Sequence, residues 1–192
     1  MTLAELAAGA IGCTRCPLAG GRTSVVFGAG DPHAALMFVG EAPGHDEDLQ
    51  GEPFVGRSGQ LLDRLLAEEL GLDRSQVYIT NTVLCRPPGN RDPRPEEIAA
   101  CRPFFDGKIA LIKPRVIVTL GNFATRLLLG TDAGIKALRG RVFRLGEAMV
   151  VPTFHPSYVL RSGSAGEPMA GMRADLIRAK EHLAAVAGSA PR

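Results

Sequence analysis

Four short, continuous apolar runs alternate with helical patterns along the sequence, and this alternation narrows the possible folds more than any other feature. The runs are rich in branched residues, as expected of strands covered on both faces. They span residues 36–39, 77–79, 116–120 and 149–151. Strands separated by helices predict a parallel sheet with helices on both sides. We therefore expect a three-layer α/β/α sandwich with a central, mainly parallel four-stranded sheet.

Four helices are predicted between and after these runs. Leucines at helical spacing follow Ser58, a suitable N-cap, and stop at Gly71. Further helices are expected over residues 95–113, over residues 122–130 with Asn122 as the N-cap, and over residues 172–186. The length suits one domain, so we expect residues 1–192 to form a single domain with a disordered tail at residues 188–192.

Four cysteines indicate one metal centre assembled from distant parts of the chain. Cys13 and Cys16 form a C-x2-C pair, whereas Cys85 and Cys101 lie far along the sequence. A tetrahedral cysteine set can hold zinc or an iron-sulfur cluster. Zinc ribbons usually carry two short C-x2-C pairs, so the wide spacing favours a cluster while leaving zinc open. Ordinary buried cysteines are a further alternative.

Composition gives only broad bounds on function. The net charge of +2 does not by itself indicate a nucleic-acid binder, so any such partner must be recognised through local patches. Arginines gather near the second cysteine pair and again before the last apolar run, at positions 86, 91, 94 and 102 and positions 139, 141 and 144. The sequence has no secretory signal and no apolar run of about twenty residues, so we expect an intracellular protein without a membrane partner.

The residues that follow the four predicted strands indicate a site. The first run leads into Gly40-Glu41-Ala42-Pro43-Gly44 and the second into Thr80-Asn81. The third is followed by Gly121-Asn122, and the fourth by Thr153-Phe154-His155-Pro156-Ser157. Open α/β sheets bind ligands beyond the carboxyl ends of their strands. A carboxylate, an amide and an imidazole converging at that edge predict a binding or catalytic pocket.

Taken together, these motifs resemble the family 4 uracil-DNA glycosylases, the iron-sulfur branch of the uracil-DNA glycosylase superfamily. The resemblance spans nearly the whole chain. It is carried by the four cysteines, Gly40-Glu41-Ala42-Pro43-Gly44 with Glu47 and Asp48, Pro53-Phe54-Val55-Gly56, Thr80-Asn81, Cys85-Arg86-Pro87-Pro88 with Asn90-Arg91, and His155-Pro156-Ser157-Tyr158 through Arg161.

The resemblance implies a 4Fe-4S cluster on the four cysteines, Cys13, Cys16, Cys85 and Cys101. It also implies a monofunctional enzyme that hydrolyses the N-glycosidic bond of uracil in single-stranded or duplex DNA and leaves an abasic site for base excision repair. We expect a monomer in a prokaryotic cytoplasm, associated with the nucleoid when it acts. The cluster is expected to be structural, because hydrolysis needs no electron.

Chemistry assigns roles to the residues of the pocket. A base inside a duplex must be flipped out before its pairing edge is read. The amide of Asn81 can match O4 and N3-H of uracil, whereas cytosine presents the opposite pattern. Phe54 would provide a stacking platform for the flipped base. The alternative interpretations are that Asn81 is a turn residue and that Phe54 is a core residue.

Bond cleavage places negative charge on the departing uracil, so the enzyme should aim donors at uracil O2. His155 is our candidate donor, with a structural histidine as the alternative. In the first motif, family 1 enzymes carry an Asp where this chain carries Ala42. Glu41 is the nearest carboxylate. It is expected to orient water or to hold the loop that starts at Gly40. Glu47 is expected near uracil C5, where it would exclude the methyl group of thymine.

DNA contacts are expected from two segments. Tyr158 and Arg161 would enter the DNA or grip its phosphates, and Ser157 would donate to a phosphate. Asn90 and Arg91 lie in a matching segment near the expected DNA path. Two alternative functions are a non-catalytic module that binds or senses uracil in DNA and keeps a structural cluster, and a zinc-stabilised α/β hydrolase of nucleotides.

Overall fold

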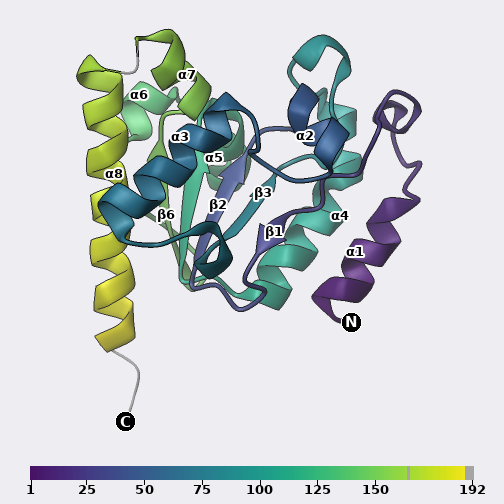
Figure 1. Cartoon of the computed structure of the whole chain (residues 1–192). Helices are drawn as coiled ribbons and strands as arrows, with labels where there is room; N and C mark the ends of the chain where they lie inside the picture. The colour runs from purple at the N-terminus through teal and green to yellow at the C-terminus, as the bar shows by residue number, and fades with distance from the viewer. Residues whose placement is uncertain (164, 189–192) are drawn as a thin grey trace.

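A computed structural model of the chain describes residues 1–163 and 165–188 (Figure 1). The tail expected to be disordered spans residues 188–192. Of these, residues 189–192 lie outside the described residues. The described strands form one sheet, and the helices surround it. The single domain over residues 1–192 stays a prediction. In chain order the elements are α1 (Leu3–Ile11), η1 (Pro17–Gly20), β1 (Ala29–Gly30), β2 (Leu36–Gly40), α2 (His45–Gln50), α3 (Arg57–Leu65), η2 (Leu66–Leu70), η3 (Arg74–Gln76), β3 (Tyr78–Asn81), η4 (Pro88–Asn90), α4 (Pro95–Ile112), β4 (Val116–Leu120), α5 (Asn122–Leu129), α6 (Ile135–Leu138), β5 (Phe143–Leu145), β6 (Ala148–Thr153), α7 (Pro156–Arg161) and α8 (Gly166–Gly188).

The sheet has six strands in the order β1-β3-β2-β4-β6-β5, so the predicted number of four is wrong. The four predicted strands are its parallel centre: β3, β2, β4 and β6. The two additional strands, β1 and β5, are short and pair antiparallel at the two edges. All residues of β2, β3 and β4 are buried, which confirms the interpretation of continuous apolar runs as strands covered on both faces.

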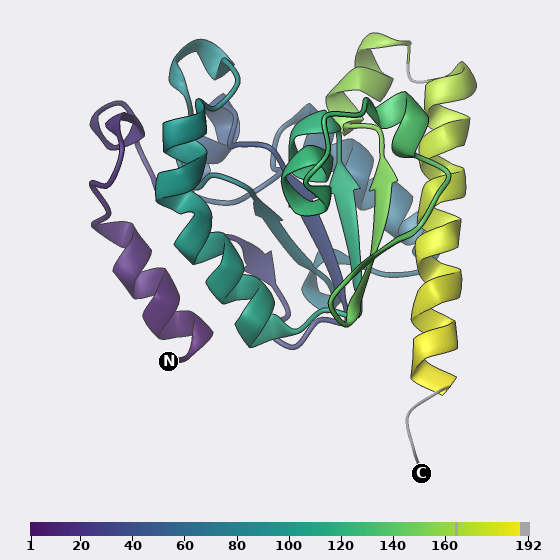
Figure 2. The ribbon, with the colours of Figure 1, turned by 180° about the vertical axis from the view of Figure 1, so that it is seen from behind.

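Helices cover both faces of the sheet, which confirms the predicted three-layer sandwich. On one face, α3, η2, α7 and α8 pack against the strands through side chains that include Leu62, Val159 and Leu176. On the other face, α4 and α5 contribute Phe105 and Ala124. Figure 1 shows α3 in front of the sheet with α8 along its left side, and Figure 2 shows α4 and α5 on the opposite face.

The N-terminal helix adds a further layer at one edge. α1 packs along the outer side of α4, and both lie away from α8 (Figures 1 and 2). The chain after α1 returns through η1 to the region where β3 ends, and a third cluster of buried side chains there includes Leu6, Leu84 and Phe104. No helix among the described residues is both long enough and apolar enough to cross a membrane.

Helix boundaries differ from the predicted ones at three positions. α3 begins at Arg57 with Gly56 as N-cap, two residues before the predicted cap Ser58. The cap of α5 is Gly121, because the side chain of Asn122 accepts a hydrogen bond from the Ile135 amide instead. α8 starts at Gly166, well before the predicted residue 172. Short helices such as α2 and α7 escape prediction because two turns carry too little periodicity.

Candidate active site

The parallel strands end together at the side of the molecule where α2 and α7 lie (Figure 1). In the register of the sheet, Gly40 of β2 pairs with Asn81 of β3, and Leu120 of β4 pairs with Thr153 of β6. The segments that follow these strands therefore face one another across the edge. This is the position at which the sequence predicts a pocket.

Gly40, Phe54 and Asn81 lie in contact at this edge. A Cβ atom added to Gly40 would lie 2.4 Å from Asn81 Oδ1 and 2.5 Å from Phe54 Cζ, so any larger residue would displace both side chains. The Phe54 ring in turn lies beside the imidazole of His155, with ring centroids 5.8 Å apart and planes inclined by 34°. Four of the predicted pocket residues are thus neighbours, although they come from four separate segments of the chain.

The Asn81 side chain is buried and holds an unused acceptor. Only 1% of the residue is exposed, and Oδ1 has no hydrogen-bond partner among the described residues. An unpaired buried polar atom costs roughly 1–3 kcal/mol, so proteins seldom keep one without a use. A ligand with an N–H group at this position would satisfy Asn81 Oδ1.

Phe54 is held in an unusual backbone conformation. Its φ angle is 55°, in the left-handed region that a non-glycine residue occupies at a cost of roughly 1–3 kcal/mol. Arg74 stabilises this turn, because its Nη2 atom donates to the carbonyl of Phe54 and, at 3.0 Å, to that of Pro53. Asp63 on α3 fixes the guanidinium through an ion pair of 2.5 Å. The strained turn therefore aims the Phe54 ring at Gly40.

His155 is a neutral imidazole with a defined tautomer. The Ser157 amide donates to its Nδ1 atom at 3.1 Å, so Nδ1 acts as an acceptor and the proton of the neutral ring is on Nε2. Burial, with a smaller effect of the Arg161 charge, lowers the pKa of His155 to about 4. Gly121 allows this placement, because a Cβ at that residue would lie 3.0 Å from His155 Cβ. The site thus offers an Nε2–H donor at neutral pH.

Glu47 joins the two loops that form the pocket. Its Oε2 atom accepts from the Gly44 amide, and Oε1 accepts from the amides of Val55 and Gly56, each at 3.0 Å. The carboxylate thereby ties the loop after β2 to the loop that contains Phe54. The predicted contact of Glu47 with uracil C5 stays a prediction, but the hydrogen bonds show that the side chain also has a structural role.

Glu41 begins the loop after β2 and lies at the end of β3. Its carbonyl accepts hydrogen bonds from the Val83 amide at 3.2 Å and the Thr82 hydroxyl at 2.6 Å. Burial and the nearby Asp92 carboxylate raise the pKa of Glu41 to about 7. A carboxyl group with this pKa can change its protonation state near neutral pH, as acid and base catalysts do.

The residues predicted to contact DNA lie on two loops. In the first, the Asn90 side chain accepts from Arg86 at 2.6 Å, and Arg91 forms a two-pronged ion pair with the buried Glu97 at 2.6 and 2.9 Å. Arg91 therefore holds its own loop and has less capacity left for a phosphate. The sequence did not indicate this pairing, because Glu97 looked like an ordinary first-turn glutamate of α4.

The second loop continues into α7. The Ser157 hydroxyl lies 2.8 Å from His155 Nδ1, and the Tyr158 ring packs against Phe154 with centroids 5.1 Å apart. Arg161 is exposed at the end of the helix. Binding of DNA by these residues stays a prediction, with Arg161 the most accessible of the three.

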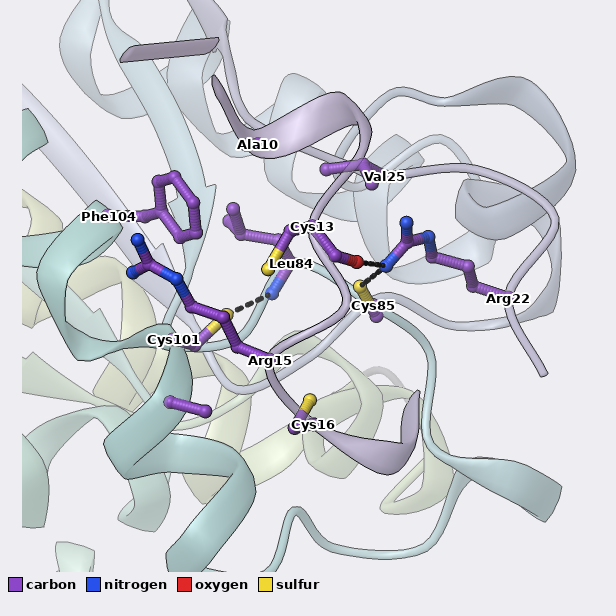
Figure 3. Close-up of a pocket in the computed structure, with 11 residues that line it drawn as sticks. Ala10, Cys13, Arg15, Cys16, Arg22, Val25, Leu84, Cys85, Cys101 and Phe104 are labelled. Atoms are coloured by element: carbon purple, nitrogen blue, oxygen red, sulfur yellow. Dashed lines mark hydrogen bonds between the residues drawn. The ribbon is translucent and has the colours of Figure 1, made fainter. Parts of the chain in front are cut away.

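All four cysteines line one cavity, to which α1 and α4 also contribute (Figure 3). Cys13 and Cys16 are partly exposed, whereas Cys85 and Cys101 are buried. Val25, Leu84 and Phe104 complete much of the apolar lining. The distant pairs predicted to form one centre are thus brought together. Within the described residues, no three His, Cys, Asp or Glu side chains are gathered to hold a single metal ion.

The chemistry of this cavity suits thiolate ligands. Arg22 Nη1 donates to Cys85 Sγ, and the Leu84 amide donates to Cys101 Sγ, each at 3.4 Å. N–H groups aimed at sulfur stabilise the charge that a bound thiolate carries. Burial raises the pKa of Cys101 to about 11, so the free thiol keeps its proton until a metal displaces it. Four cysteines with such donors fit a cysteine-ligated metal group.

Several residues that build the site were not identified from the sequence. Besides Arg74, they include Asp175 of α8, a buried carboxylate that accepts from the Thr153 hydroxyl at 2.9 Å and from Arg139 Nε at 3.0 Å. This contact fixes the end of β6 just before His155. An aspartate within an amphipathic helix gives no local signal of such a role, because its partners are distant in sequence.

Comparison with known proteins shows to which protein family the chain belongs. The chain matches the family model of the uracil DNA glycosylase superfamily over residues 27–177. It therefore belongs to the uracil-DNA glycosylase superfamily. The match includes the pocket residues from Gly40 to His155, whereas Cys13 and Cys16 lie before its first residue.

Individual relatives identify the branch that the chain resembles. A Type-4 uracil-DNA glycosylase of Thermotoga maritima is 51% identical over 154 residues, which cover 79% of this chain and 80% of the relative. A Type-4 enzyme of Sulfurisphaera tokodaii is 47% identical over 158 residues, covering 78% and 72%. A Type-5 uracil-DNA glycosylase of Mycobacterium leprae is 31% identical over 184 residues, covering 84% and 79%. The two Type-4 relatives confirm the resemblance inferred from the motifs.

Proposed function

We propose that this chain is a monofunctional uracil-DNA glycosylase that flips uracil out of DNA, hydrolyses its N-glycosidic bond and leaves an abasic site. Family membership and the Type-4 relatives support the reaction. One observation carries the choice of base: the buried, unpaired Oδ1 acceptor of Asn81. Uracil has an N3–H donor for this atom, whereas neutral cytosine has a lone pair at N3 that would leave the acceptor unpaired.

The pocket residues have complementary roles in binding the base. The Asn81 amide reads the pairing edge, and the Phe54 ring provides an apolar face for stacking, a contact worth about 1–3 kcal/mol per base. Gly40 leaves the space that the two side chains occupy. Glu47, which is fixed by three backbone amides, borders the pocket on the side proposed for uracil C5. A side chain held in this way cannot readily yield to the methyl group of thymine.

Cleavage is proposed to depend on stabilisation of the departing base. As the glycosidic bond lengthens, the sugar gains positive charge and uracil gains negative charge. His155 donates its Nε2–H to uracil O2, and the Ser157 amide holds the tautomer that carries this proton. The ionised carboxylate of Glu41 holds water or stabilises the cationic sugar. The abasic product forms when the glycosidic bond breaks, uracil leaves with the electron pair, and water adds to the sugar carbon and gives one proton to the Glu41 carboxylate.

The cofactor is proposed to be a 4Fe-4S cluster held by Cys13, Cys16, Cys85 and Cys101. Support comes from the four cysteines that line one cavity, the two N–H···S hydrogen bonds and the similarity to Type-4 enzymes. Such a cluster supplies a rigid cross-link between distant chain segments, since hydrolysis needs no electron. The cysteines thereby join the segment after α1 to the loop that follows β3.

The substrate is proposed to be uracil-containing DNA, single-stranded or duplex, bound by a monomer. Arg161, Tyr158 and Ser157 lie on the loop that carries His155, so phosphate contacts there would position the flipped nucleotide. The test is incubation with single-stranded and duplex oligonucleotides that contain one uracil, followed by alkaline cleavage at abasic sites. Cleavage at the uracil position supports the proposal. Binding without cleavage would instead support a sensing module.

Activity is expected to rise with pH up to neutrality because of Glu41. Its pKa of about 7 means that the carboxyl is mostly protonated below pH 7 and mostly ionised above it. If the ionised form is needed, kcat/KM should fall about tenfold for each pH unit below 7 and level off above it. Steady-state kinetics between pH 5 and 9 measure this profile, and Glu41→Gln should remove its acidic limb.

Asp92→Asn provides a matched test of the cause of this profile. Removing the neighbouring negative charge should lower the pKa of Glu41, so the acidic limb should move to lower pH with the plateau unchanged. An acidic limb that persists in Glu41→Gln would show that another group titrates.

Loss of the cluster is expected to weaken both the fold and DNA binding. Cys85→Ser removes a buried ligand and should abolish visible absorbance and bound iron. A stability loss of about 4 kcal/mol would lower the melting temperature by roughly 8–16 °C in a domain of this size. Calorimetry and titration of labelled DNA measure the two effects. Unchanged melting, absorbance and DNA affinity in Cys85→Ser would contradict the structural role.

A further inference from the structure

Helix α2 carries two adjacent carboxylates that bind different parts of the chain. Glu47 accepts hydrogen bonds from the amides of the pocket loops, as described above. The next residue, Asp48, is 3% exposed and points to the segment that follows the first cysteine pair. α2 therefore lies between the pocket and the cysteine cavity, although the function proposed above uses only the first of its carboxylates.

Asp48 holds two consecutive backbone amides with both of its oxygens. Oδ1 accepts from Thr23 at 2.9 Å and from Ser24 at 3.2 Å, and Oδ2 accepts from Thr23 at 3.1 Å. No ion pair in the described part of the chain includes Asp48, so these amides are what stabilises its buried charge. If the Asp48 side chain moved away from Thr23 and Ser24, its charge would be buried without hydrogen bonds, at a large cost in free energy.

The residue before these amides reaches the cysteines. Arg22 Nη1 donates to the Cys13 carbonyl at 2.7 Å and to Cys85 Sγ at 3.4 Å, as Figure 3 shows. A second nitrogen of the guanidinium donates to the Ile11 carbonyl at 3.3 Å. Residues 22–24 are thus bound to the cysteine cavity on one side and to α2 on the other.

We propose that Asp48 is a positioning residue that couples the metal centre to the uracil pocket, an inference that rests on the function and cofactor proposed above. A bound cluster fixes Cys13, Cys16 and Cys85, and Arg22 carries that order to Thr23 and Ser24. Asp48 then holds α2 in place, and Glu47 holds the loops that contain Gly44 and Phe54. A hydrolase thereby uses a distant cluster to keep its base pocket formed.

The shortness of α2 explains why it depends on such contacts. The helix has six residues, far fewer than the roughly 12–15 that an isolated helix needs to be stable in water. Tertiary contacts therefore determine the position of α2. Among them, the hydrogen bonds of Asp48 are buried and involve a charged carboxylate. When Thr23 and Ser24 lose their order, α2 and the pocket loops should open more often.

Hydrogen exchange of backbone amides tests the coupling without requiring catalysis. Cluster-loaded wild type is compared with Asp48→Asn, which removes the charge and replaces one acceptor oxygen with an NH2 group that would face the Thr23 amide. The variant should keep its iron and visible absorbance, while amides in residues 44–56, including Val55 and Gly56, exchange at least tenfold faster. Amides of β2 and β4 should be unchanged, which a general loss of stability would not allow.

Removing the cluster by Cys16→Ser should speed exchange in residues 44–56 of the wild-type background by a similar factor. In the Asp48→Asn background the same removal should add little, because the connection is already broken. Independent, multiplicative effects would overturn the proposal, as would unchanged exchange in residues 44–56 after cluster loss. Glu52→Gln, which alters an exposed carboxylate just after α2, is the matched control and should behave as wild type.

Arg22→Gln decides the question if Asp48→Asn fails to fold. It breaks the connection at the cysteine end without altering α2 and should also speed exchange in residues 44–56; unchanged exchange overturns the coupling. Kinetics provide a second measurement: Asp48→Asn should raise KM for uracil-containing DNA more than it lowers kcat, because the pocket is formed less often.

Exchange coupling in a protein that releases no uracil would refute the proposed function and leave the coupling intact.

Discussion

Asn81→Ala is expected to lower kcat/KM for uracil release by about 1000-fold. The side chain is proposed to make two hydrogen bonds to the base, each worth roughly 2 kcal/mol in a buried site, and 1.4 kcal/mol corresponds to a factor of ten. Because Asn81 Oδ1 is already unpaired, the fold should lose little stability when the amide is removed. Single-turnover kinetics on a single-stranded substrate, together with thermal melting, measure both effects.

Asn81→Asp is the matched control, since it keeps the size of the side chain but replaces the amide donor with an acceptor. It should lose most activity on uracil, because a carboxylate oxygen would face uracil O4. Activity close to wild type in both variants would show that Asn81 does not read the base. A large loss of folding stability in Asn81→Ala would assign the residue to the turn after β3 instead.

His155→Ala is expected to lower kcat by about 100- to 1000-fold with little change in KM. The imidazole is proposed to stabilise charge that develops only in the transition state, and removing one such donor in other enzymes has an effect of this size. The pKa of about 4 adds a second expectation: activity should show no loss from His155 protonation until the pH falls below about 5. Steady-state kinetics across this pH range measure both effects.

Ser157→Ala separates the donor from its support. The backbone amide of residue 157 still donates to His155 Nδ1 after the hydroxyl is removed, so the tautomer should persist and kcat should fall tenfold or less. A change in KM alone for His155→Ala would indicate that the residue binds substrate without assisting bond cleavage.

Much of the fold follows from the sequence, and the exceptions have physical reasons. The central strands were predictable because each is a continuous apolar run buried on both faces. The edge strands were missed because β1 has only two residues, Ala29 and Gly30, and β5 alternates between half-buried and exposed positions. Pairing to a neighbour, and not composition, makes such edge segments strands.

The site divides in a similar way between what the sequence predicts and what needs the structure. Asn81 and His155 were predictable because each follows a buried strand, and parallel strands end at one edge. Arg74 and Asp175 were not, because each acts on a segment far away in sequence: Arg74 on the Phe54 turn and Asp175 on Thr153. The motifs indicate which side chains face the ligand, whereas tertiary contacts determine what holds them.

The identity of the released base is the most direct test of the central claim that the Asn81 pocket recognises and excises uracil. Pure, iron-loaded protein is incubated with oligonucleotides that contain a single uracil, and the free base is quantified by chromatography. We predict one uracil released for each abasic site, no thymine or cytosine, and about 1000-fold slower release by Asn81→Ala. No uracil from wild-type protein, or equal release by Asn81→Ala, would contradict the account.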